Sequence, residues 1–513
     1  MSRRIGIAAL IWGTSVLLSR VIGVVREAVI GRVLGGGAEA DVYWTAFVLP
    51  DFLTYLLAGG ALSLVFIPIF SGYLARDDED GGWRVFSTIF NFVLVLMSLL
   101  TAALWLGAPR IVPFLGPGFD EAQLELLTRL TRIILPAQIF HVLGGLMSSV
   151  LQAKDRHGEA AFANLGYSGS IVLMGLLLGP HIGAEGFAWG VLVGSFLGPF
   201  GLPLIGCLRT RFGWRPLLKL GEPDFKQYLW LSLPIMLGFS IMAVDDWLLR
   251  RFGSLVGEGT VSRLTYAKVL MKVPMGVFGL AVGAAAYPTI SRLISEERRV
   301  EAHDTLVKAC RMMLVLAFAS QAAFTVAGAE VAEVIWGTTR FTQAELDEIG
   351  LFTGIFCLAL GGWSANTLLA RGFYAAKRTW VPTLIGSAAV LVFLPVYWQL
   401  GQQLGGLGLA LSSSLAVLTY TTVLAVVLRR FLAGPDSPRL LDLVFKMALA
   451  TGLGVAAGKG VDTLIELPAL VQGALTGGVA LAVTLGAAML LRVPEVSQVI
   501  GLVLGKVKRK LGR

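Results

Sequence analysis

The residues best suited to chemistry in this chain are charged side chains inside long apolar stretches. Arg20, Arg26 and Glu27 lie in the first such stretch, and Lys268 and Lys272 lie in a later one. A charged group at the centre of a membrane-spanning helix costs about 2.5–3.5 kcal/mol on insertion scales, so it usually faces a cavity or a partner. Arginine binds phosphate oxygens in pairs and lysine acts as a point charge, so these cations are suited to an anionic ligand.

Helical spacing indicates which of these charges share a face. Arg20 and Glu27 are seven residues apart, which places them on one face of a helix. Lys268 and Lys272 are spaced i,i+4 and repel each other unless water, carboxylates or an anion lies nearby. We predict a cationic substrate-binding cavity of Arg20, Arg26, Lys268 and Lys272. Its expected supporting acids are Glu27, Asp41, Asp51, Asp245 and Asp246.

Alternative structural roles remain open for several charges. Asp41 and Asp51 lie near an expected helix start, where a carboxylate also suits the helix dipole. Asp246 and Arg250 are spaced i,i+4 and could satisfy each other. For six arginines near expected helix ends, we expect the charged head to snorkel to the membrane surface. These are Arg3, Arg4, Arg129, Arg132, Arg250 and Arg251.

The composition around these residues is that of a polytopic helical membrane protein. Of 513 residues, 56% are hydrophobic and 15% are charged, with a mean hydropathy of +0.76. An average soluble domain is about 25% charged. The three cysteines are far apart, so we expect neither a disulfide framework nor a zinc site. No nucleic-acid module, nucleotide-binding domain or nucleophile–base grouping is recognisable, so we expect no nucleic-acid partner, no cofactor and no enzyme.

A window of about 20 apolar residues predicts about 14 membrane spans. The candidate stretches are 5–34, 42–74, 85–108, 126–152, 160–180, 184–207, 225–250, 262–293, 305–327, 346–375, 380–399, 404–428, 441–460 and 468–492. Lys and Arg are concentrated in alternate connectors and at both ends of the chain. The positive-inside rule then predicts that both termini are cytoplasmic, which agrees with an even number of spans.

The two halves of the sequence resemble each other weakly. Pro68-Ile69-Phe70-Ser71 is similar to Pro288-Thr289-Ile290-Ser291, and two further pairs share an offset of roughly 220–224 residues. An even number of spans per copy predicts parallel repeats related by an axis along the membrane normal. We therefore predict an N-lobe at 1–210, a C-lobe at 222–432, and two extra helices with a basic cytoplasmic tail at 440–513.

The first apolar stretch carries a motif that resembles a known family. Ser19-Arg20-Val21-Ile22-Gly23-Val24-Val25-Arg26-Glu27, followed by Gly35 and Ala40-Asp41, is similar to the first-helix signature of the MurJ (MviN) lipid II flippases. That family belongs to the multidrug/oligosaccharidyl-lipid/polysaccharide exporter superfamily. Further similar segments are Ala58-Gly59-Gly60-Ala61-Leu62-Ser63, Phe66-Ile67-Pro68, Gly337 with Phe341-Thr342, and Arg371-Gly372-Phe373-Tyr374-Ala375.

The resemblance implies a fold and a mechanism. Two six-helix lobes enclose a cationic cavity that binds the pyrophosphate of undecaprenyl-linked peptidoglycan precursor. Alternating access moves the headgroup outward, and the two extra helices form a groove for the lipid tail. The implied location is the bacterial cytoplasmic (inner) membrane. The implied partners are lipid II, membrane lipids and cell-wall synthesis proteins, and we expect a monomer.

Several positions depart from the family pattern. Val48 stands where the family typically has Lys, Asp51 where it has Asn, and Thr54 where it has Arg. Lys268-Val269 stands where the family has an Asp-Arg pair. The departures suggest a divergent member and leave alternatives open. These are a flippase for another lipid-linked oligosaccharide, a cation-coupled multidrug or small-solute exporter of the same superfamily, and a scaffold that does not transport.

Overall fold

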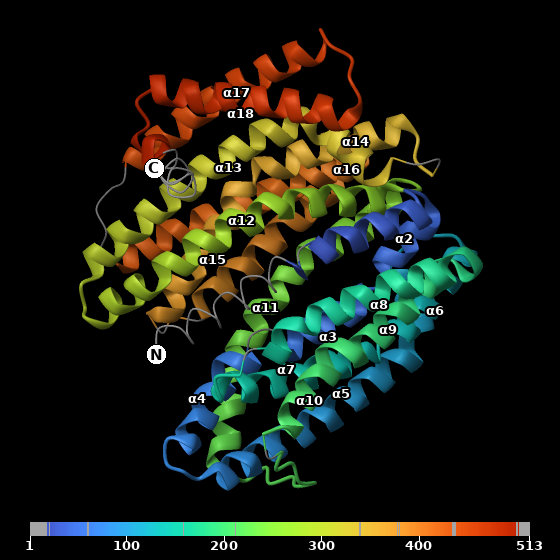
Figure 1. The fold of residues 1–513 in the computed structure, drawn as a ribbon, viewed down its shortest axis with the longest axis vertical. Coiled ribbons are helices and arrows are strands. Elements are labelled where there is room, and N and C mark those ends of the chain that lie inside the picture. Colours follow the sequence, from blue (N-terminus) through green and yellow to red (C-terminus); the bar gives the residue numbers. More distant parts are fainter. Residues whose placement is uncertain are drawn as a thin grey trace, which may run out of the picture. The chain divides into compact units, whose positions relative to one another are not determined.

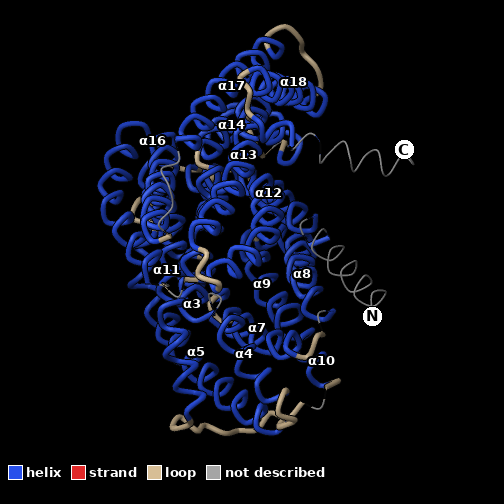
Figure 2. Tube along the Cα trace, turned by 90° about the vertical axis from the view of Figure 1, so that its left-hand side faces the viewer, coloured by secondary structure: helices blue, strands red, loops and turns tan. Residues whose placement is uncertain are grey.

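The computed structural model describes residues 18–19, 21–58, 61–156, 158–210, 212–337, 340–376, 378, 380–432, 438–498 and 501. Within these ranges the regular elements are helices and none is a strand, which confirms the predicted all-α fold (Figures 1 and 2). The physical reason is that lipid offers no hydrogen bonds, so each apolar stretch must satisfy its own backbone as a helix.

The chain divides into two compact units, Met1–Ser262 and Arg263–Arg513. In the first unit residues 21–34 are largely helical. The elements that follow are α2 (Ala38–Thr45), α3 (Val48–Ala58), α4 (Ala61–Leu74), α5 (Glu79–Leu115), α6 (Glu121–Ile134), α7 (Ala137–Ala153), α8 (Gly158–Ile182), α9 (Ala184–Ser195), the π-helix η1 (Phe196–Gly201), α10 (Leu202–Leu208) and α11 (Pro223–Val256).

The second unit begins within the first turn of α12 (Thr260–Ser295). It continues with α13 (Arg299–Trp336), α14 (Gln343–Leu358), α15 (Leu360–Ala375), α16 (Trp380–Phe431), α17 (Pro438–Asp462) and α18 (Ala469–Leu490). The division by contacts therefore follows α11, whereas the predicted lobes are separated at residues 211–221. The lobes were predicted from the sequence repeat, and their boundaries stay a prediction.

Most predicted spans coincide with helices, but one boundary was wrong. The stretch 42–74 begins inside α2, which ends at Thr45, and a turn at residues 46–47 separates it from α3. Stretches 380–399 and 404–428 both lie in α16, and its helical path breaks at Gly405, where φ is 58° and ψ is −137°, so two helices meet next to the predicted connector. Among the described residues, eight helices are long and apolar enough to cross a membrane, or nine if the bent pair α14–α15 is one span.

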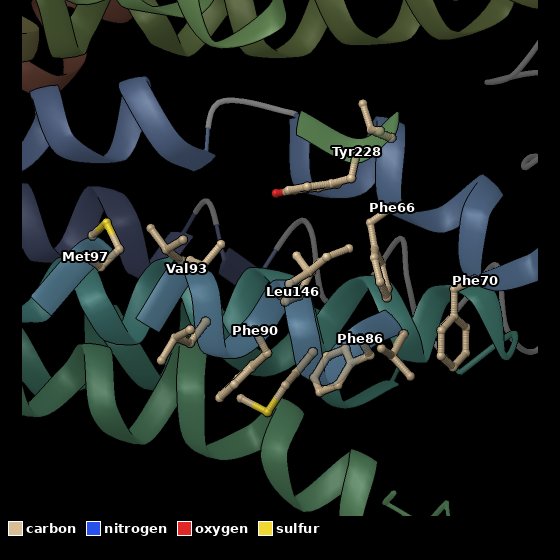
Figure 3. Close-up of a cluster of buried hydrophobic side chains, with 14 of the residues drawn as sticks. Phe66, Phe70, Phe86, Phe90, Val93, Met97, Leu146 and Tyr228 are labelled. Carbon is tan, nitrogen blue, oxygen red and sulfur yellow. The ribbon is translucent and has the colours of Figure 1, made fainter. Parts of the chain in front are cut away.

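An aromatic cluster forms the core of the first unit. Phe66 and Phe70 from α4 pack against Phe86 from α5, and Leu146 from α7 and Tyr228 from α11 are in the same cluster (Figure 3). The Phe66 and Phe86 ring centroids are 6.0 Å apart in an edge-to-face arrangement. Lipid is as apolar as these side chains, so close packing rather than the hydrophobic effect must hold the helices together.

Small residues let α17 and α18 approach each other and α13. A Cβ atom at Gly454 would lie 2.0 Å from Thr484 Oγ1, and one at Gly477 would lie 3.1 Å from the Ala327 Cβ. Figure 1 shows α17 and α18 side by side, with α13 next to them. This is the small-residue packing expected between membrane helices.

Candidate functional site

Arg26 is held at the surface of the first unit by its neighbour in sequence. Its Nε and Nη2 both donate to Glu27 Oε1, and the Nε contact is 3.2 Å. The guanidinium carbon lies 6.0 Å from the centre of the Tyr167 ring on α8. Glu27 is buried, whereas the Arg26 side chain is 26% exposed. Arg26 is thus positioned by a carboxylate and a ring while part of it stays accessible. Arg20, its predicted companion, lies outside the described residues.

Asp51 and Arg250 connect α3 with α11. Arg250 Nη1 lies 3.5 Å from Asp51 Oδ2, and Arg250 is largely buried while Asp51 is partly exposed. The structure therefore brings a predicted acid together with an arginine 199 residues away in sequence. Asp245 and Asp246 are half-buried on α11. The Arg250–Asp51 pair was not predicted, because sequence spacing reveals only partners on the same helix.

Asp41 caps a helix that starts more than 200 residues later. Its Oδ2 accepts from the Gly259 N–H at 2.7 Å, and its Oδ1 accepts from the Ser262 N–H at 2.6 Å. Gly259 directly precedes α12 and Ser262 lies in its first turn, where N–H groups have no partner within the helix. Asp41 is 1% exposed. The Asp41 carboxylate therefore lies at a helix N-terminus, as the helix-dipole hypothesis expected. The helix is α12, whereas Asp41 itself belongs to α2.

Two further carboxylates cap helices in the same manner, and sequence reasoning missed both. Glu258 Oε1 accepts from the Ala38 N–H that starts α2, and Glu39 Oε1 accepts from the Ala184 N–H that starts α9, at 3.1 and 2.6 Å. Both helices have a glycine at the N-cap, Gly37 or Gly183, with no side chain to cap them. A helix start without Ser, Thr, Asp or Asn was the available signal that a cap must come from elsewhere.

The caps at α2 and α12 are reciprocal. Glu258, just before α12, caps α2, and Asp41, on α2, caps α12. A Cβ atom at Gly37 would lie 3.3 Å from Glu258 Oε1, so the glycine allows the carboxylate to approach. Ser262 Oγ adds a hydrogen bond of 3.0 Å to the Gly36 carbonyl. Two segments 220 residues apart are thereby joined by four hydrogen bonds to backbone groups.

Lys268 and Lys272 have different environments on α12. Lys268 is 4% exposed, and its Nζ lies 5.3 Å from the centre of the Trp363 ring on α15. Lys272, one turn further, is exposed. The spacing placed both on one face, but neighbouring helices cover only the first. Within the described ranges, no group of three or more His, Cys, Asp or Glu could hold a metal ion.

Of the six arginines expected to snorkel, Arg3 and Arg4 lie outside the described residues, and the other four contact protein groups. Arg132 Nε donates to the Trp105 carbonyl at 3.0 Å, and its guanidinium lies 4.5 Å from the Trp105 ring centre. This carbonyl needs a donor because Pro109, four residues on in α5, has no N–H. Arg129 pairs with Glu125 and Glu185, and Arg251 donates to the Phe114 carbonyl at the end of α5.

Comparisons with known proteins establish the family. The family described as "MurJ: Lipid II flippase MurJ" matches residues 30–469. The chain belongs to the MurJ family. The "Probable lipid II flippase MurJ" of Vibrio cholerae serotype O1 is 26% identical over 440 residues, which is 81% of each chain. The "Lipid II flippase MurJ" of Burkholderia cenocepacia is 27% identical over 421 residues, 78% of this chain and 81% of the relative.

Solved structures agree on the fold of this MurJ family member. The structure titled "Lipid II flippase MurJ, inward closed conformation" has a TM-score of 0.77 at 17% identity and covers 98% of this chain and 100% of that one. An inward-facing multidrug resistance MATE family transporter of the MOP superfamily has a TM-score of 0.67 at 15% identity, with 80% and 94% covered. The chain is therefore a multi-pass inner-membrane protein with the fold of that superfamily.

Val48 and Lys268, two of the predicted departures from the family pattern, are buried, and Thr54 is half-buried. Val48, at the start of α3, is buried. Thr54 donates its hydroxyl to Gln138 Oε1 on α7. Lys268 is buried against Trp363. Val48 and Thr54 are thus uncharged side chains of the first unit: Val48 packs in its interior, and Thr54 forms a hydrogen bond there.

Proposed function

We propose that this MurJ family member is a flippase that moves lipid II, the undecaprenyl-pyrophosphate-linked peptidoglycan precursor, across the cytoplasmic membrane. The family match and the names of the relatives support this substrate. The observation that carries the proposal is Arg26, which lies within a membrane-length apolar stretch and has a side chain that is 26% exposed. A cation in that setting is retained for a ligand or pathway.

The cationic cavity of the proposal consists of Arg20, Arg26, Lys268 and Lys272. Arg26 uses Nε and Nη2 for Glu27, so Nη1 remains for a phosphate oxygen. Lys272 is exposed and can reach a ligand directly. Lys268 is buried, so its contribution would be the field of its charge rather than contact. The negative charge of Glu27 offsets the repulsion between Arg26 and the other cations of the site. Its hydrogen bonds also orient the Arg26 side chain.

The proposed transport cycle is alternating access. In it, the reciprocal caps between α2 and the start of α12 would hold the outer side of the protein closed. The connectors around residues 35–37 and 257–259 are on the outside in the predicted topology. Opening there would separate α2 from the start of α12, and the hydrogen bonds of Asp41 and Glu258 would break. Each freed N–H could then bind water, so the cost is small enough for a reversible step.

The remaining assignments are part of the same proposal. Both termini are cytoplasmic, and the lobes are 1–210 and 222–432. Helices α17 and α18 receive the lipid tail, and their apolar outward side chains, including Leu441, Phe445 and Leu470, are exposed. We propose that the protein acts as a monomer, alongside cell-wall synthesis proteins that supply and consume lipid II.

Complementation of a bacterium depleted of its lipid II flippase tests the proposal. Wild type should restore growth, whereas Arg26→Ala and Lys272→Ala should not, with membrane levels matched by immunoblot. Arg110→Ala, which removes an exposed cation from α5, is the matched control and should rescue. Rescue by both test variants would show that the cationic cavity is wrong. Failure of an inserted wild type would favour another lipid-linked oligosaccharide as substrate.

The exporter alternative predicts a different result. A cation-coupled multidrug exporter would raise the tolerance of a pump-deficient strain to toxic cations and would not rescue the depleted strain. The MATE structure supports the shared fold, but it covers 80% of this chain against 98% for the MurJ structure. The two assays, run with the same plasmids, separate the two functions.

A further inference from the structure

The connector between α10 and α11 is fixed to the membrane helix α5 by polar side chains of that helix. Asn91 Nδ2 donates to the carbonyls of Arg215 and Leu217, both at 2.9 Å. Asn91 Oδ1 accepts from Trp214 Nε1 at 3.0 Å, and Ser87 Oγ accepts from the Arg215 N–H at 3.0 Å. An asparagine in an apolar helix is costly unless its amide is bonded. Here three bonds to the connector satisfy it.

The exposed residues of this connector are both apolar and basic. Phe212 is anchored in the core, with its ring 5.4 Å from that of Trp83. Trp214 is 41% exposed, and Leu218 and Leu220 are also exposed. Among them lie two exposed cations, Arg215 and Lys219, each with a carboxylate 3.7 Å away. Exposed tryptophan and leucine side chains next to cations are typical of a segment at the boundary between acyl chains and headgroups.

The length of α5 places the connector at that boundary. The helix has 37 residues and is about 55 Å long, whereas the hydrocarbon core is about 30 Å thick. A core of about 20 residues that ends near residue 108, where the predicted span ends, begins near residue 88. Ser87 and Asn91 are within one turn of that level. The charge pattern predicts that this end is cytoplasmic, where membranes carry anionic lipids.

We propose that residues 212–222 form a binding site for anionic phospholipid headgroups of the cytoplasmic leaflet. Arg215 and Lys219 bind the phosphate, Trp214, Leu218 and Leu220 contact the acyl chains, and Asn91 holds the segment in place. The site lies in the connector directly before α11, so bound lipid would fix the end at which α11 begins. This inference is independent of the proposed transport activity.

Lipid binding to the purified full chain tests the site. Phosphatidylglycerol and phosphatidylcholine are titrated separately into the protein in neutral detergent, and bound lipids are counted by native mass spectrometry. Each cation near an anionic surface contributes about fivefold in affinity, so Arg215→Gln/Lys219→Gln should weaken phosphatidylglycerol binding by at least tenfold. Phosphatidylcholine binding should not change. The matched control removes two exposed cations elsewhere, Arg110→Gln/Arg340→Gln, and should change binding less than twofold.

A second variant separates the site from simple charge. Asn91→Leu keeps both cations but releases the connector from α5, and it should also weaken phosphatidylglycerol binding. Equal losses in the Arg215/Lys219 and Arg110/Arg340 variants would overturn the proposal, because binding would then follow net charge. Unchanged binding in Arg215→Gln/Lys219→Gln, or equal binding of the two lipids by wild type, would overturn it as well.

Discussion

Asp41→Asn isolates the reciprocal caps with a change of a single atom. The carboxylate accepts one hydrogen bond on each oxygen, from Gly259 at 2.7 Å and Ser262 at 2.6 Å, and it is 1% exposed. In asparagine one oxygen becomes an NH₂ group, which cannot accept. Either orientation of the amide therefore leaves one buried N–H of the α12 start facing a donor.

The expected magnitude follows from these contacts. A hydrogen bond to a charged group contributes about 1.5–3 kcal/mol, and a carboxylate at a partly buried helix N-terminus up to about 2 kcal/mol. Relief of carboxylate desolvation offsets part of this, so we expect a loss of about 2–3 kcal/mol. If the first unit unfolds as one domain of about 250 residues, its Tm should fall by about 5–10 °C.

The assay is thermal unfolding of the purified full chain, with Asp77→Asn as control. Asp77 is exposed in the connector before α5 and has φ of 56°, a conformation that asparagine also tolerates. The control should shift Tm by less than 2 °C on the scale of surface substitutions. Labelling of Thr260→Cys, at a buried position in the first turn of α12, gives a second measure. Asp41→Asn should increase its labelling rate at least tenfold. Equal Tm values and labelling rates in the two Asn variants would refute the role of the cap.

Two further predictions concern Arg132 and Lys268. Arg132→Gln should lower the unfolding free energy of the wild type by about 1–3 kcal/mol, because the Trp105 carbonyl loses its donor. In a Pro109→Ala background residue 109 regains an N–H that can bond this carbonyl, so the loss should be at least about 1 kcal/mol smaller. A double-mutant cycle of unfolding free energies measures this coupling, and additive losses would contradict it. Lys268→Met should lower complementation at matched membrane levels, because it removes a buried positive charge at similar side-chain volume. Complementation equal to wild type would show that the Lys268 charge has no part in transport.

Hydropathy and the first-helix motif predicted the all-helical fold, the location of most helices and the family. Prediction failed where the helical path depends on contacts. We predicted stretch 42–74 as one span because it is mostly apolar, but α2 ends at Thr45 and α3 begins at Val48 within it. The apolar content of a window indicates that it can enter lipid, and it does not indicate where the helix is interrupted.

The candidate site was predicted less completely than the fold. The residue types were recognisable, because a charge in an apolar helix is rare. Their partners were not. Arg26 and Glu27 are neighbours in sequence and in space, but Arg250 pairs with Asp51 from a distant helix. Glu39 and Glu258 were overlooked because each acts on a helix far away in sequence.

The sequence by itself determined that this chain is a helical membrane protein of the MurJ family. Membrane insertion responds to the hydropathy of about 20 consecutive residues and to nearby positive charge, and both are local properties of the chain. Only the tertiary structure decided that Asp41 caps α12 and that Lys268 is covered by Trp363 while Lys272 is exposed. Those roles depend on which helices pack together, and burial by a distant segment sets the energy of a charge more than its own neighbours in sequence do.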